Sequence, residues 1–491
     1  MLVGRLRDQL GESIGLEENG RLVWLGNFEV ERFWRTEGLL SLPLLSTHSA
    51  GSESLINSLS ELALWLADPH DLVLLHRRPD PDFIQYMKQL GWSVPQFITI
   101  DGVPSLPLTD SLLADEQVCA QIRQWASQQR TTEGQASVSL MPHGASPLEE
   151  RLAHRSDLRL AAPESEVVQK VNSKIYSRRI CAELGIRQPQ GSIAHTLTEL
   201  EQAAHELRSL WKSGPLVVKD AMGVSGKGII VLEDEQRFEQ IMRLLRRSAE
   251  RDGHERIEFV IEQWLPKQCD LNATFTIDAQ GNMRWGTLLR ALVQQGVHQG
   301  HQYPHGISAE LEAVMRDTGE RIGSRLAADS YFGPVGIDAM ISKEGTIYPC
   351  LEINARLNMS SYHVGLLDKL LSERADYALI SQIHFRRERT FSFAELQQAL
   401  EPVLYTLERR LGIVVCAFAP ACADSVRTMD AGEAQKDSKY AYPGEGKRKV
   451  DQQGQGRLYI MSIGSSTEQC SSYIQRCKEL LEEIPGIQCR N

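Results

Sequence analysis

The sequence predicts an α/β protein built from three parts. Its 491 residues are too many for one compact core, so two or three domains are expected. Near the start of the chain, short apolar runs of strand length alternate with segments of helical spacing. Near the end, a long polar stretch interrupts a second, shorter α/β pattern. We therefore expect an N-terminal α/β domain over residues 1–165, a central region over 166–388, and a small C-terminal α/β domain over 389–491.

The first domain is predicted from strand–helix–strand alternation. Strands are expected over residues 21–27, 71–76 and 97–100, with a helix over 81–90, which together indicate βαβ units. Residues 128–146 are rich in Gln, Ser, Thr and Gly, so this stretch is predicted to be a loop.

The central region contains most of the predicted elements. Its helices are expected over residues 165–184, 235–249 and 311–327. Its strands are expected over residues 216–219, 228–232, 259–265, 271–277, 283–289, 331–341 and 346–353. The C-terminal part is expected to have helices over 395–411 and 468–483, strands over 412–418 and 457–463, and a polar loop over 424–456.

The composition excludes several classes of protein. The formal net charge is −11, and an acidic protein offers no extended basic surface to neutralise nucleic-acid phosphates. No run of about 18 apolar residues occurs, and charged residues interrupt the first dozen positions, so neither a membrane span nor a signal peptide is expected. The nine cysteines are scattered without a CxxC pair, which indicates reduced thiols. We expect a cytoplasmic protein.

A glycine-rich turn follows the strand that ends at Lys219. The segment from Lys219 to Gly228 reads KDAMGVSGKG, and Gly223, Gly226 and Gly228 frame a short turn between two strands. Glycines let backbone amides approach phosphate oxygens, and Lys219 and Lys227 would neutralise the phosphate charge. The spacing is not that of a Walker A loop. A plain β-hairpin with a glycine-rich turn would account for the segment equally well.

A second signal is the sequence EQWL at residues 262–265, followed by Asp270. A buried strand that runs into a polar stretch can offer its own amide and carbonyl to an adenine edge. A carboxylate just beyond the strand can accept hydrogen bonds from ribose hydroxyls. Taken alone, the segment fits a buried strand with a polar turn better than a nucleotide site.

Two neighbouring strands near residue 350 carry the strongest signal. Asp338 lies in GIDAM, and Glu352, Asn354 and Arg356 alternate along LEINAR, so these three side chains point to one face. Two carboxylates and an amide oxygen are hard donors that suit Mg²⁺. Arg356 beside them would stabilise charge on a transferring phosphoryl group. A solvated polar face is a poor alternative, because the flanking residues are apolar and two neighbouring carboxylates repel without a cation.

Three histidines, His298, His301 and His305, lie in the segment VHQGHQYPHG. A zinc site is one interpretation. Because the segment contains Gly and Pro and no nearby Cys, a polar loop that contacts substrate is the favoured one.

These signals, in this order over about residues 170–370, resemble the ATP-grasp superfamily. The resemblance implies an ATP-grasp core of two α+β subdomains, with a lid at about 190–268, after a pre-ATP-grasp domain. The ExNxR ending is closer to biotin carboxylase and amino-acid ligases than to D-alanine ligases. The layout of the three parts resembles the pheganomycin-type peptide ligases and the butirosin-type carrier-protein ligase of antibiotic biosynthesis.

The resemblance also implies roles for individual residues. Mg²⁺, or Mn²⁺ in its place, would be held by Asp338, Glu352 and Asn354. D-alanine ligases carry an Arg two residues before the metal-binding Asp, where this chain has Gly336, so Arg356 or Arg290 must supply that charge as the catalytic arginine. His305 or Arg290 would contact a substrate carboxylate. ATP would be bound by Lys174, Lys219, Gly223, Ser225, Gly226, Lys227, Gly228, Glu262, Gln263, Trp264, Leu265 and, with a spacing longer by one, Asp270.

The implied activity is an ADP-forming ligase. A carboxylate substrate, an amino acid or a peptide, would attack the γ-phosphorus of ATP to give an acyl phosphate. A small amine would then displace phosphate to form an amide or peptide bond, as in secondary-metabolite biosynthesis. We expect no nucleic-acid or membrane partner, and a homodimer is left open.

Two alternatives stay open beside the amine ligase. An amino acid–[acyl-carrier protein] ligase would form a thioester and would need a docking face, often basic, for an acidic carrier protein. The acidic composition weighs slightly against such a carrier partner. A non-catalytic ATP-binding regulator would lack the metal carboxylates, and both are present.

Overall fold

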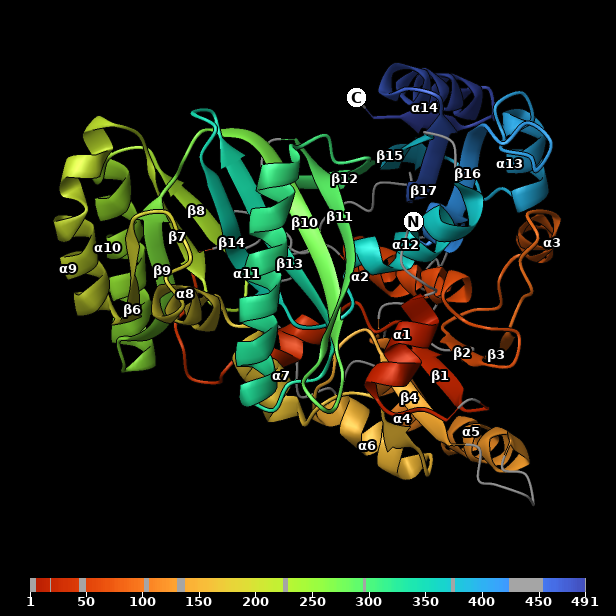
Figure 1. Cartoon of the computed structure of the whole chain (residues 1–491), viewed down its shortest axis with the longest axis horizontal. Helices are drawn as coiled ribbons and strands as arrows, with labels where there is room; N and C mark the ends of the chain where they lie inside the picture. Colours follow the sequence, from red (N-terminus) through yellow and green to blue (C-terminus); the bar gives the residue numbers. More distant parts are fainter. Residues whose placement is uncertain are drawn as a thin grey trace.

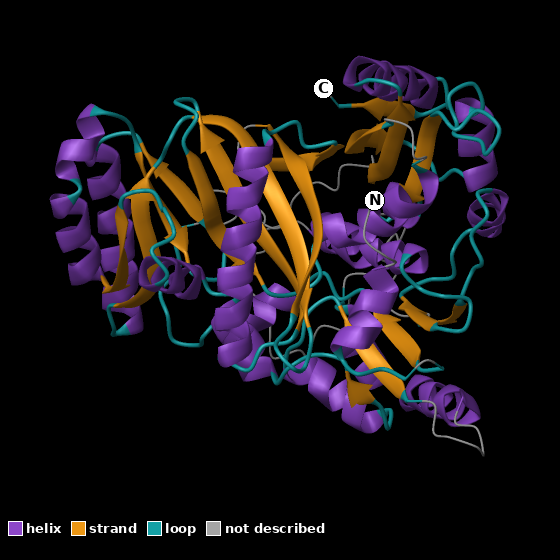
Figure 2. Cartoon of the chain, in the orientation of Figure 1, coloured by secondary structure: helices purple, strands orange, loops and turns teal. Residues whose placement is uncertain are grey.

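Three β-sheets with helices packed against them make up the computed structural model (Figure 1). In Figure 2 the strands form separate layers, and the helices lie mostly on their outer faces. The structure describes residues 6–17, 19–43, 50–100, 106–129, 137–223, 228–294, 297–371, 376–423 and 454–490. The predicted α/β fold class is confirmed.

The first sheet has five parallel strands in the order β3-β2-β1-β4-β5. The strands are β1 (Arg21–Leu25), β2 (Leu72–Leu75), β3 (Gln96–Thr99), β4 (Val138–Pro142) and β5 (Arg159–Leu160). Wholly apolar runs such as LVLL in β2 form strands of this kind because helices cover both faces of a parallel sheet. The loops after β1 and β4 leave the same edge of this sheet, and they face the central region.

Short helices surround this sheet. They are α1 (Leu6–Ser13), η1 (Val30–Trp34), α2 (Ala50–Asn57), η2 (Ser58–Trp65), α3 (Pro81–Gln89), α4 (Leu108–Ala114), α5 (Glu116–Gln129) and α6 (Pro147–Arg155). The predicted strands and helix are present here. The predicted loop over 128–146 was wrong, because β4 lies inside it: polar residues on both sides conceal a buried run of five residues.

The second sheet lies within residues 190–268, the part of the chain predicted to be the lid, and we call it the lid for that reason. Four antiparallel strands lie in the order β6-β9-β7-β8, and they are β6 (Gly191–Thr196), β7 (Leu216–Asp220), β8 (Ile229–Leu232) and β9 (Arg256–Gln263). Helices α9 (Leu197–Glu206) and α10 (Glu235–Asp252) and the short η3 (Arg208–Lys212) accompany them. The buried residues of α10 recur at intervals of three or four, which is the spacing of a helix with one apolar face.

The third sheet has nine strands and spans the central and C-terminal parts. Its order is β14-β13-β10-β11-β12-β15-β17-β16, and β18 pairs with β15. The strands are β10 (Lys267–Ile277), β11 (Met283–Gln294), β12 (Val297–Tyr303), β13 (Gly333–Ser342), β14 (Ile347–Asn354), β15 (Tyr377–Arg387), β16 (Gly412–Ala417), β17 (Gly454–Gly464) and β18 (Ile487–Cys489). Strand β15 pairs with β12 on one side and β17 on the other, so the sheet runs without a break across the proposed boundary at residue 388.

Helices cover both faces of the large sheet. They are α7 (Ser165–Val171), α8 (Lys174–Glu183), α11 (Ala309–Ala328), α12 (Met359–Leu370), α13 (Phe393–Leu400), the short η4 (Ala419–Cys422) and α14 (Thr467–Glu482). Helix α11 covers one face of β10 and β11, and α1 and α12 contact β10 from the other side (Figure 1). No helix in the described part of the chain is long and apolar enough to cross a membrane.

Two predicted helices differ from the observed ones. The helix over 165–184 is two helices, because Ser173 caps the second by accepting a hydrogen bond from the amide of Ile175. The helix over 395–411 ends at Leu400, just before Pro402, which has no amide hydrogen to continue the helix. Most of the predicted loop over 424–456 lies outside the described residues.

A buried carboxylate ties the start of the first domain together. Asp71 is fully buried and accepts hydrogen bonds from the amide of Leu22 (2.9 Å), the indole of Trp24 (3.0 Å) and the guanidinium of Arg7 (3.0 Å). We expect Asp71→Ala to lower the free energy of unfolding by about 3 kcal/mol, because the buried amide of Leu22 and the buried indole of Trp24 lose their acceptor and Arg7 loses its counter-charge. Urea unfolding followed by Trp fluorescence measures this. An unchanged midpoint would show that the network is dispensable.

Candidate active site

The residues predicted to hold a metal meet on one face of the large sheet. The register places Glu352 of β14 opposite Asp338 of β13, and Asp338 opposite Asn272 of β10. Residues directly opposite each other share a face. Nδ2 of Asn272 donates to Oδ1 of Asp338 (2.8 Å), and Nδ2 of Asn354 donates to Oδ2 of Asp338 (3.0 Å). We call Glu352, Asp338, Asn354 and Asn272 the acidic row.

The electrostatics of the acidic row favour a cation. The pKa of Asp338 is raised to about 6, chiefly by burial and then by the nearby charge of Glu352, and the hydrogen bonds from the two Asn side chains only partly offset these effects. Within the described residues, no three acidic, imidazole or thiol groups are placed to hold a metal ion by themselves. A metal here would therefore need the amide oxygen of Asn354, water or nucleotide phosphates as further ligands, which fits Mg²⁺ better than a protein-enclosed metal.

Lys174 links the acidic row to the glycine-rich turn. It begins α8 and is 5% exposed, and its Nζ donates to Oε1 of Glu352 (2.8 Å) and to the carbonyl of Gly223 (2.5 Å). The base of the turn is closed by Asp220, whose amide donates to the carbonyl of Gly228 (2.8 Å). Gly228 has a φ of +82°, which favours glycine. The predicted ATP contacts Ser225, Gly226 and Lys227 lie outside the described residues.

Two cations converge on Glu262 at the inner end of the lid. Nζ of Lys219 lies 2.5 Å from Oε1 of Glu262, and a guanidinium nitrogen of Arg178 lies 2.7 Å from Oε2. Glu262 is 6% exposed, so this carboxylate holds both cations in a water-poor position. Arg178 was not predicted, although it stands one helical turn after Lys174 on α8 and therefore on the same face.

The segment that follows Glu262 has one unused backbone donor. The amide of Gln263 donates to the carbonyl of Gln190 (2.8 Å), and the amide of Trp264 donates to the carbonyl of Pro215 (2.9 Å). Among the described residues, the amide of Leu265 has no such partner. Asp270 lies two residues before Asn272 on β10, on the same face, and pairs with Lys267 (2.7 Å).

Arg356 lies where the acidic row meets the first domain. Its guanidinium donates to Oδ1 of Asn354 (3.0 Å) and forms an ion pair with Glu31, which lies in η1 after strand β1. Burial lowers the pKa of Arg356 to about 10. Its Nε and Nδ2 of Asn358 are buried donors with no partner among the described residues. Buried donors are normally satisfied, so two of them beside a metal-type site indicate a place for an anion.

The first domain supplies one wall beside Arg356. The amide of Leu357 donates to the carbonyl of His143 (3.0 Å), and the ring of His143 lies 4.4 Å from that of Phe28. Nδ1 of His143 shares a hydrogen bond with the hydroxyl of Tyr362 on α12 (2.9 Å). Phe28 and His143 follow β1 and β4, so the carboxyl edge of the parallel sheet faces this site.

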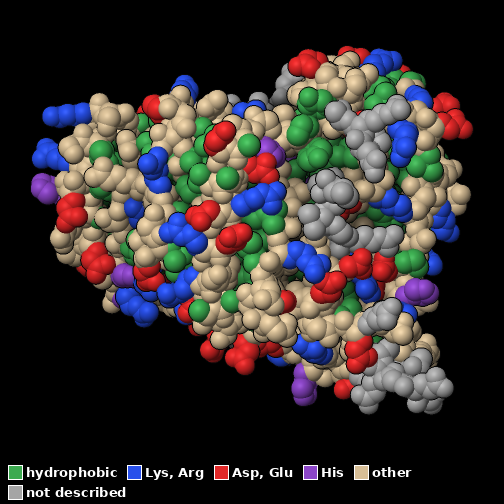
Figure 3. Space-filling model, viewed as in Figure 1, with side chains coloured by type: hydrophobic (Ala, Val, Ile, Leu, Met, Phe, Trp, Pro, Cys, Tyr) green, Lys and Arg blue, Asp and Glu red, His purple; other side chains and the backbone are tan. Residues whose placement is uncertain are grey.

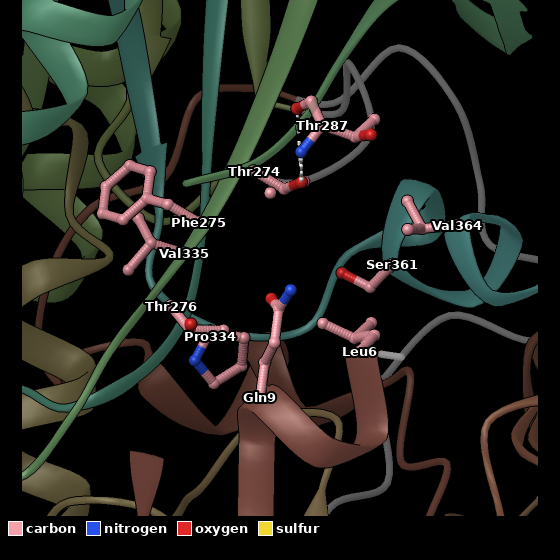
Figure 4. Close-up of a pocket in the computed structure, with 11 residues that line it drawn as sticks. Leu6, Gln9, Thr274, Phe275, Thr276, Thr287, Pro334, Val335, Ser361 and Val364 are labelled. Carbon is pink, nitrogen blue, oxygen red and sulfur yellow. Dashed lines mark hydrogen bonds between the residues drawn. The ribbon is translucent and has the colours of Figure 1, made fainter. Parts of the chain in front are cut away.

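A pocket lies on the same face of the large sheet, beyond Asn272 (Figure 4). Thr274 lies two residues after Asn272, and its hydroxyl accepts from the amide of Thr287 (3.0 Å). None of the described residues that line the pocket is charged; they are Leu6, Gln9, Thr274, Phe275, Thr276, Gly286, Thr287, Pro334, Val335, Ser361 and Val364.

Comparison with known families identifies the chain. Residues 60–158 match the pre-ATP-grasp domain, and residues 173–364 match the ATP-binding domain of the carbamoyl-phosphate synthase L chain. The chain belongs to the ATP-grasp superfamily. The recognition made from the sequence is therefore confirmed.

Curated relatives of this ATP-grasp chain are distant. It is 23% identical over 365 residues to "[Butirosin acyl-carrier protein]--L-glutamate ligase" of Niallia circulans, which covers 74% of this chain and 79% of the relative. It is 23% identical over 225 residues to the formate-dependent phosphoribosylglycinamide formyltransferase of Methanocaldococcus jannaschii, covering 46% and 52% respectively.

Solved structures share the ATP-grasp fold. The N5-carboxyaminoimidazole synthetase of Staphylococcus aureus, complexed with ADP, superposes with a TM-score of 0.51 at 12% identity, covering 94% of this chain and 98% of that one. The biotin carboxylase domain of Hydrogenobacter thermophilus 2-oxoglutarate carboxylase gives 0.50 at 13% identity, covering 96% and 91%. At such identities these matches support the fold alone.

Two residues proposed for substrate contact lie elsewhere in the ATP-grasp core. Arg290 is opposite Leu271, whose side chain packs in the core under α11, so the register directs Arg290 to the face away from Asp338. We therefore leave Arg290 out of the proposed catalytic set. His305 lies 3.6 Å from Glu312 on α11, whereas Nε2 of His298 and Nε2 of His301 are 3.3 Å apart. The predicted cluster of three histidines is thus a pair, and the predicted polar loop was wrong for this pair, because His298 and His301 lie on strand β12, which is hydrogen-bonded on both sides.

Asn358 packs against Gly336, the position two residues before Asp338 where D-alanine ligases carry an arginine, and leaves no room there for a side chain. A Cβ at Gly336 would stand 2.1 Å from Nδ2 of Asn358. We expect Gly336→Ala to displace Asn358 and to lower ATP-dependent turnover about tenfold or more, since reacting groups must be held precisely. Steady-state ADP release measures this. Gly365→Ala on α12 is the control, because its Cβ would meet only ordinary contacts. Equal activity in both variants would contradict the assigned position of Asn358.

Proposed function

We propose that this ATP-grasp chain is an ATP- and magnesium-dependent, ADP-forming ligase that activates a carboxylate as an acyl phosphate and joins it to an amine. The observation that carries the proposal is the meeting of Asp338, Glu352 and Asn354 beside Lys174, with the unpartnered donors of Arg356 and Asn358 next to them. A site of this kind brings a nucleotide phosphate and a second anion together, as phosphoryl transfer to a carboxylate requires.

The residues from Lys174 to Asp270 are suited to hold ATP between the lid and the large sheet. Lys219 and Arg178 flank Glu262 and supply positive charge at the end of the lid. The free amide of Leu265 and the adjoining carbonyls offer the donor and acceptor pair that an adenine edge needs. Asp270 lies on the same face as Asn272. It could accept hydrogen bonds from ribose hydroxyls once its ion pair with Lys267 is broken.

The acidic row is suited to Mg²⁺. Bound there with ATP, Mg²⁺ would neutralise the β- and γ-phosphate oxygens during transfer. Asp338 and Glu352 would hold it with charge, and Asn354 with its amide oxygen, once the present bond from Arg356 to that oxygen is exchanged. Asn272 would keep Asp338 oriented. Lys174 would bridge this row and the phosphate-binding turn.

The second anion would be the substrate carboxylate. Nε of Arg356 and Nδ2 of Asn358 offer hydrogen bonds that no described protein group uses. A carboxylate held there would lie next to the transferring phosphoryl group, and its oxygen would attack the γ-phosphorus to release ADP. The acceptor would then attack the acyl carbon and release phosphate. Positioning and charge supply the catalysis, so no covalent enzyme intermediate is required.

A carrier-protein ligase is the second candidate. The curated relative from Niallia circulans is named as a ligase that acts on an acyl-carrier protein, which favours a thiol acceptor. Against it, the chain carries a net charge of −11, and the face in Figure 3 shows acidic and basic side chains interspersed rather than a basic docking surface. We also propose that the acceptor is a small amine, that the domains span residues 1–165, 166–388 and 389–491, and that the reaction serves antibiotic biosynthesis.

One experiment separates the two acceptors. Purified protein is given ATP, Mg²⁺ and a panel of amino acids and dipeptides, with and without a phosphopantetheinylated carrier protein, and ADP release and product masses are measured. An amide product that forms without the carrier supports the proposal. Loading of the carrier, with no free amine supporting ADP release, would replace it with the thioester reaction.

The acidic row gives the first functional prediction. Glu352→Gln should lower kcat roughly 100-fold or more with the fold intact, because the metal loses a charged ligand beside the transferring phosphoryl group. Coupled-enzyme detection of ADP measures the rate, and circular dichroism checks the fold. The matched control is Glu344→Gln, which alters an exposed carboxylate on the turn of the same hairpin. A folded Glu352→Gln variant with normal turnover would sink the metal assignment.

Lys219 gives the second functional prediction. Lys219→Ala should raise the KM for ATP about tenfold and change kcat less, because this contact is present in both the ground and transition states. Initial rates over a range of ATP concentrations give both constants. Lys212→Ala, an exposed lysine of the same lid, should leave them unchanged. If Lys219→Ala has the wild-type KM, Lys219 serves only to balance the charge of Glu262.

A further inference from the structure

A segment of the first domain reaches across to the lid. We call residues 31–42 the strap. Its first part is fixed in the first domain, where Trp34 is 3% exposed and its indole donates to the carbonyl of Ala145 (2.7 Å). Its last part lies in the lid: the amide of Leu40 donates to the carbonyl of Arg256 (2.9 Å), and Leu40 and Leu42 are buried in the lid core. The strap therefore packs against both the first domain and the lid.

Between these anchors the strap contacts the base of the phosphate-binding turn. A guanidinium nitrogen of Arg35 donates to Oδ2 of Asp220 (2.9 Å). A small pocket lies between the strap and the turn, lined by Arg35, Thr36, Leu39, Leu40, Asp220, Met222 and Glu258. The ion pair between Arg35 and Asp220 therefore borders a pocket.

Asp220 is the residue that shapes the described part of the turn. Its amide donates to the carbonyl of Gly228 (2.8 Å), and its own carbonyl accepts from the amide of Gly223 (3.1 Å). Its Oδ1 accepts from the amide of Met222 (3.2 Å), which leaves Oδ2 for Arg35. Gly223 in turn accepts from Lys174, the residue paired with Glu352. A change in the orientation of Asp220 would therefore move both ends of the turn.

We propose that Arg35 is a positioning residue for nucleotide binding: through Asp220, the first domain sets the positions of Gly223 and Gly228, the described ends of the phosphate-binding turn. The proposal rests on the proposed function only in requiring that the turn binds nucleotide phosphate. It does not depend on which carboxylate or which acceptor is used. It adds a residue from outside the ATP-grasp core to those that determine nucleotide affinity.

The exposure of the pair separates positioning from stability. The Arg35 side chain is 42% exposed, and ion pairs of this exposure add little to the free energy of unfolding. Arg32, on the same strap, is also 42% exposed but pairs with Glu53 of the first domain (3.5 Å). Arg32→Gln is therefore a matched control that removes an equally exposed charge whose ion-pair partner, Glu53, lies in the first domain.

The test measures the affinity of the full-length protein for Mg·ADP by isothermal titration calorimetry. We expect Arg35→Gln to weaken binding about threefold, which is within the range that an ion pair of this exposure can supply, and Arg35→Lys to restore most of the affinity, because a lysine keeps the charge opposite Asp220. Arg32→Gln should bind as the wild type does. The thermal unfolding midpoints of all three variants should stay at the wild-type value.

A double-variant cycle makes the pathway through Asp220 falsifiable. Asp220→Asn keeps an oxygen for the Met222 amide but removes the charge that faces Arg35. The Arg35→Gln/Asp220→Asn variant should bind Mg·ADP no more weakly than the weaker single variant. Fully additive losses, or wild-type affinity in Arg35→Gln, would overturn the proposal. Normal Mg·ADP binding by a wild-type protein without ligase activity would instead overturn the proposed function and leave this inference standing.

Discussion

The register between β13 and β14 is the constraint on which the rest of the site depends. It sets half-buried Asp338 directly opposite half-buried Glu352, whose side chain is 28% exposed. Two like charges so close are unfavourable, and the surrounding residues all act to offset them: Asn272 and Asn354 donate to one carboxylate, and Lys174 pairs with the other. Lys174 also donates a hydrogen bond to the carbonyl of Gly223, so the position of Glu352 is linked to the glycine-rich turn of the lid.

The first domain does more than cover this sheet. The loops after its first and fourth strands contribute Glu31, Phe28 and His143 around Arg356. Glu31 forms an ion pair with the guanidinium of Arg356, beside the position where we propose that a substrate carboxylate binds. A carboxylate substrate must therefore bind beside a resident negative charge, which disfavours substrates with a second negative group near the reacting one.

Much of this could be predicted from the sequence because it rests on local patterns. Strand periodicity is enough to bring Glu352 and Asn354 to one face, and the glycine spacing is enough to indicate the turn after Lys219. Arg290 was misassigned because periodicity fixes alternation but not which face is buried under α11; only the pairing with Leu271 decides that. Asn272 and Arg178 carry no distinctive motif. The contacts of Glu31 with Arg356 and of Arg35 with Asp220 join residues 185 or more positions apart, which no local pattern encodes.

Continuous hydrogen bonding across β12, β15 and β17 limits where the chain of this enzyme can be truncated. A chain cut after residue 388 would retain β15 while losing β17 and β18, leaving eleven residues of backbone donors and acceptors without partners along one side. Exposed strand edges of that length recruit other chains. The C-terminal part therefore acts as the molecule's own protection against edge-to-edge aggregation, and shortened versions made for crystallisation or transplantation need a new covering for β15.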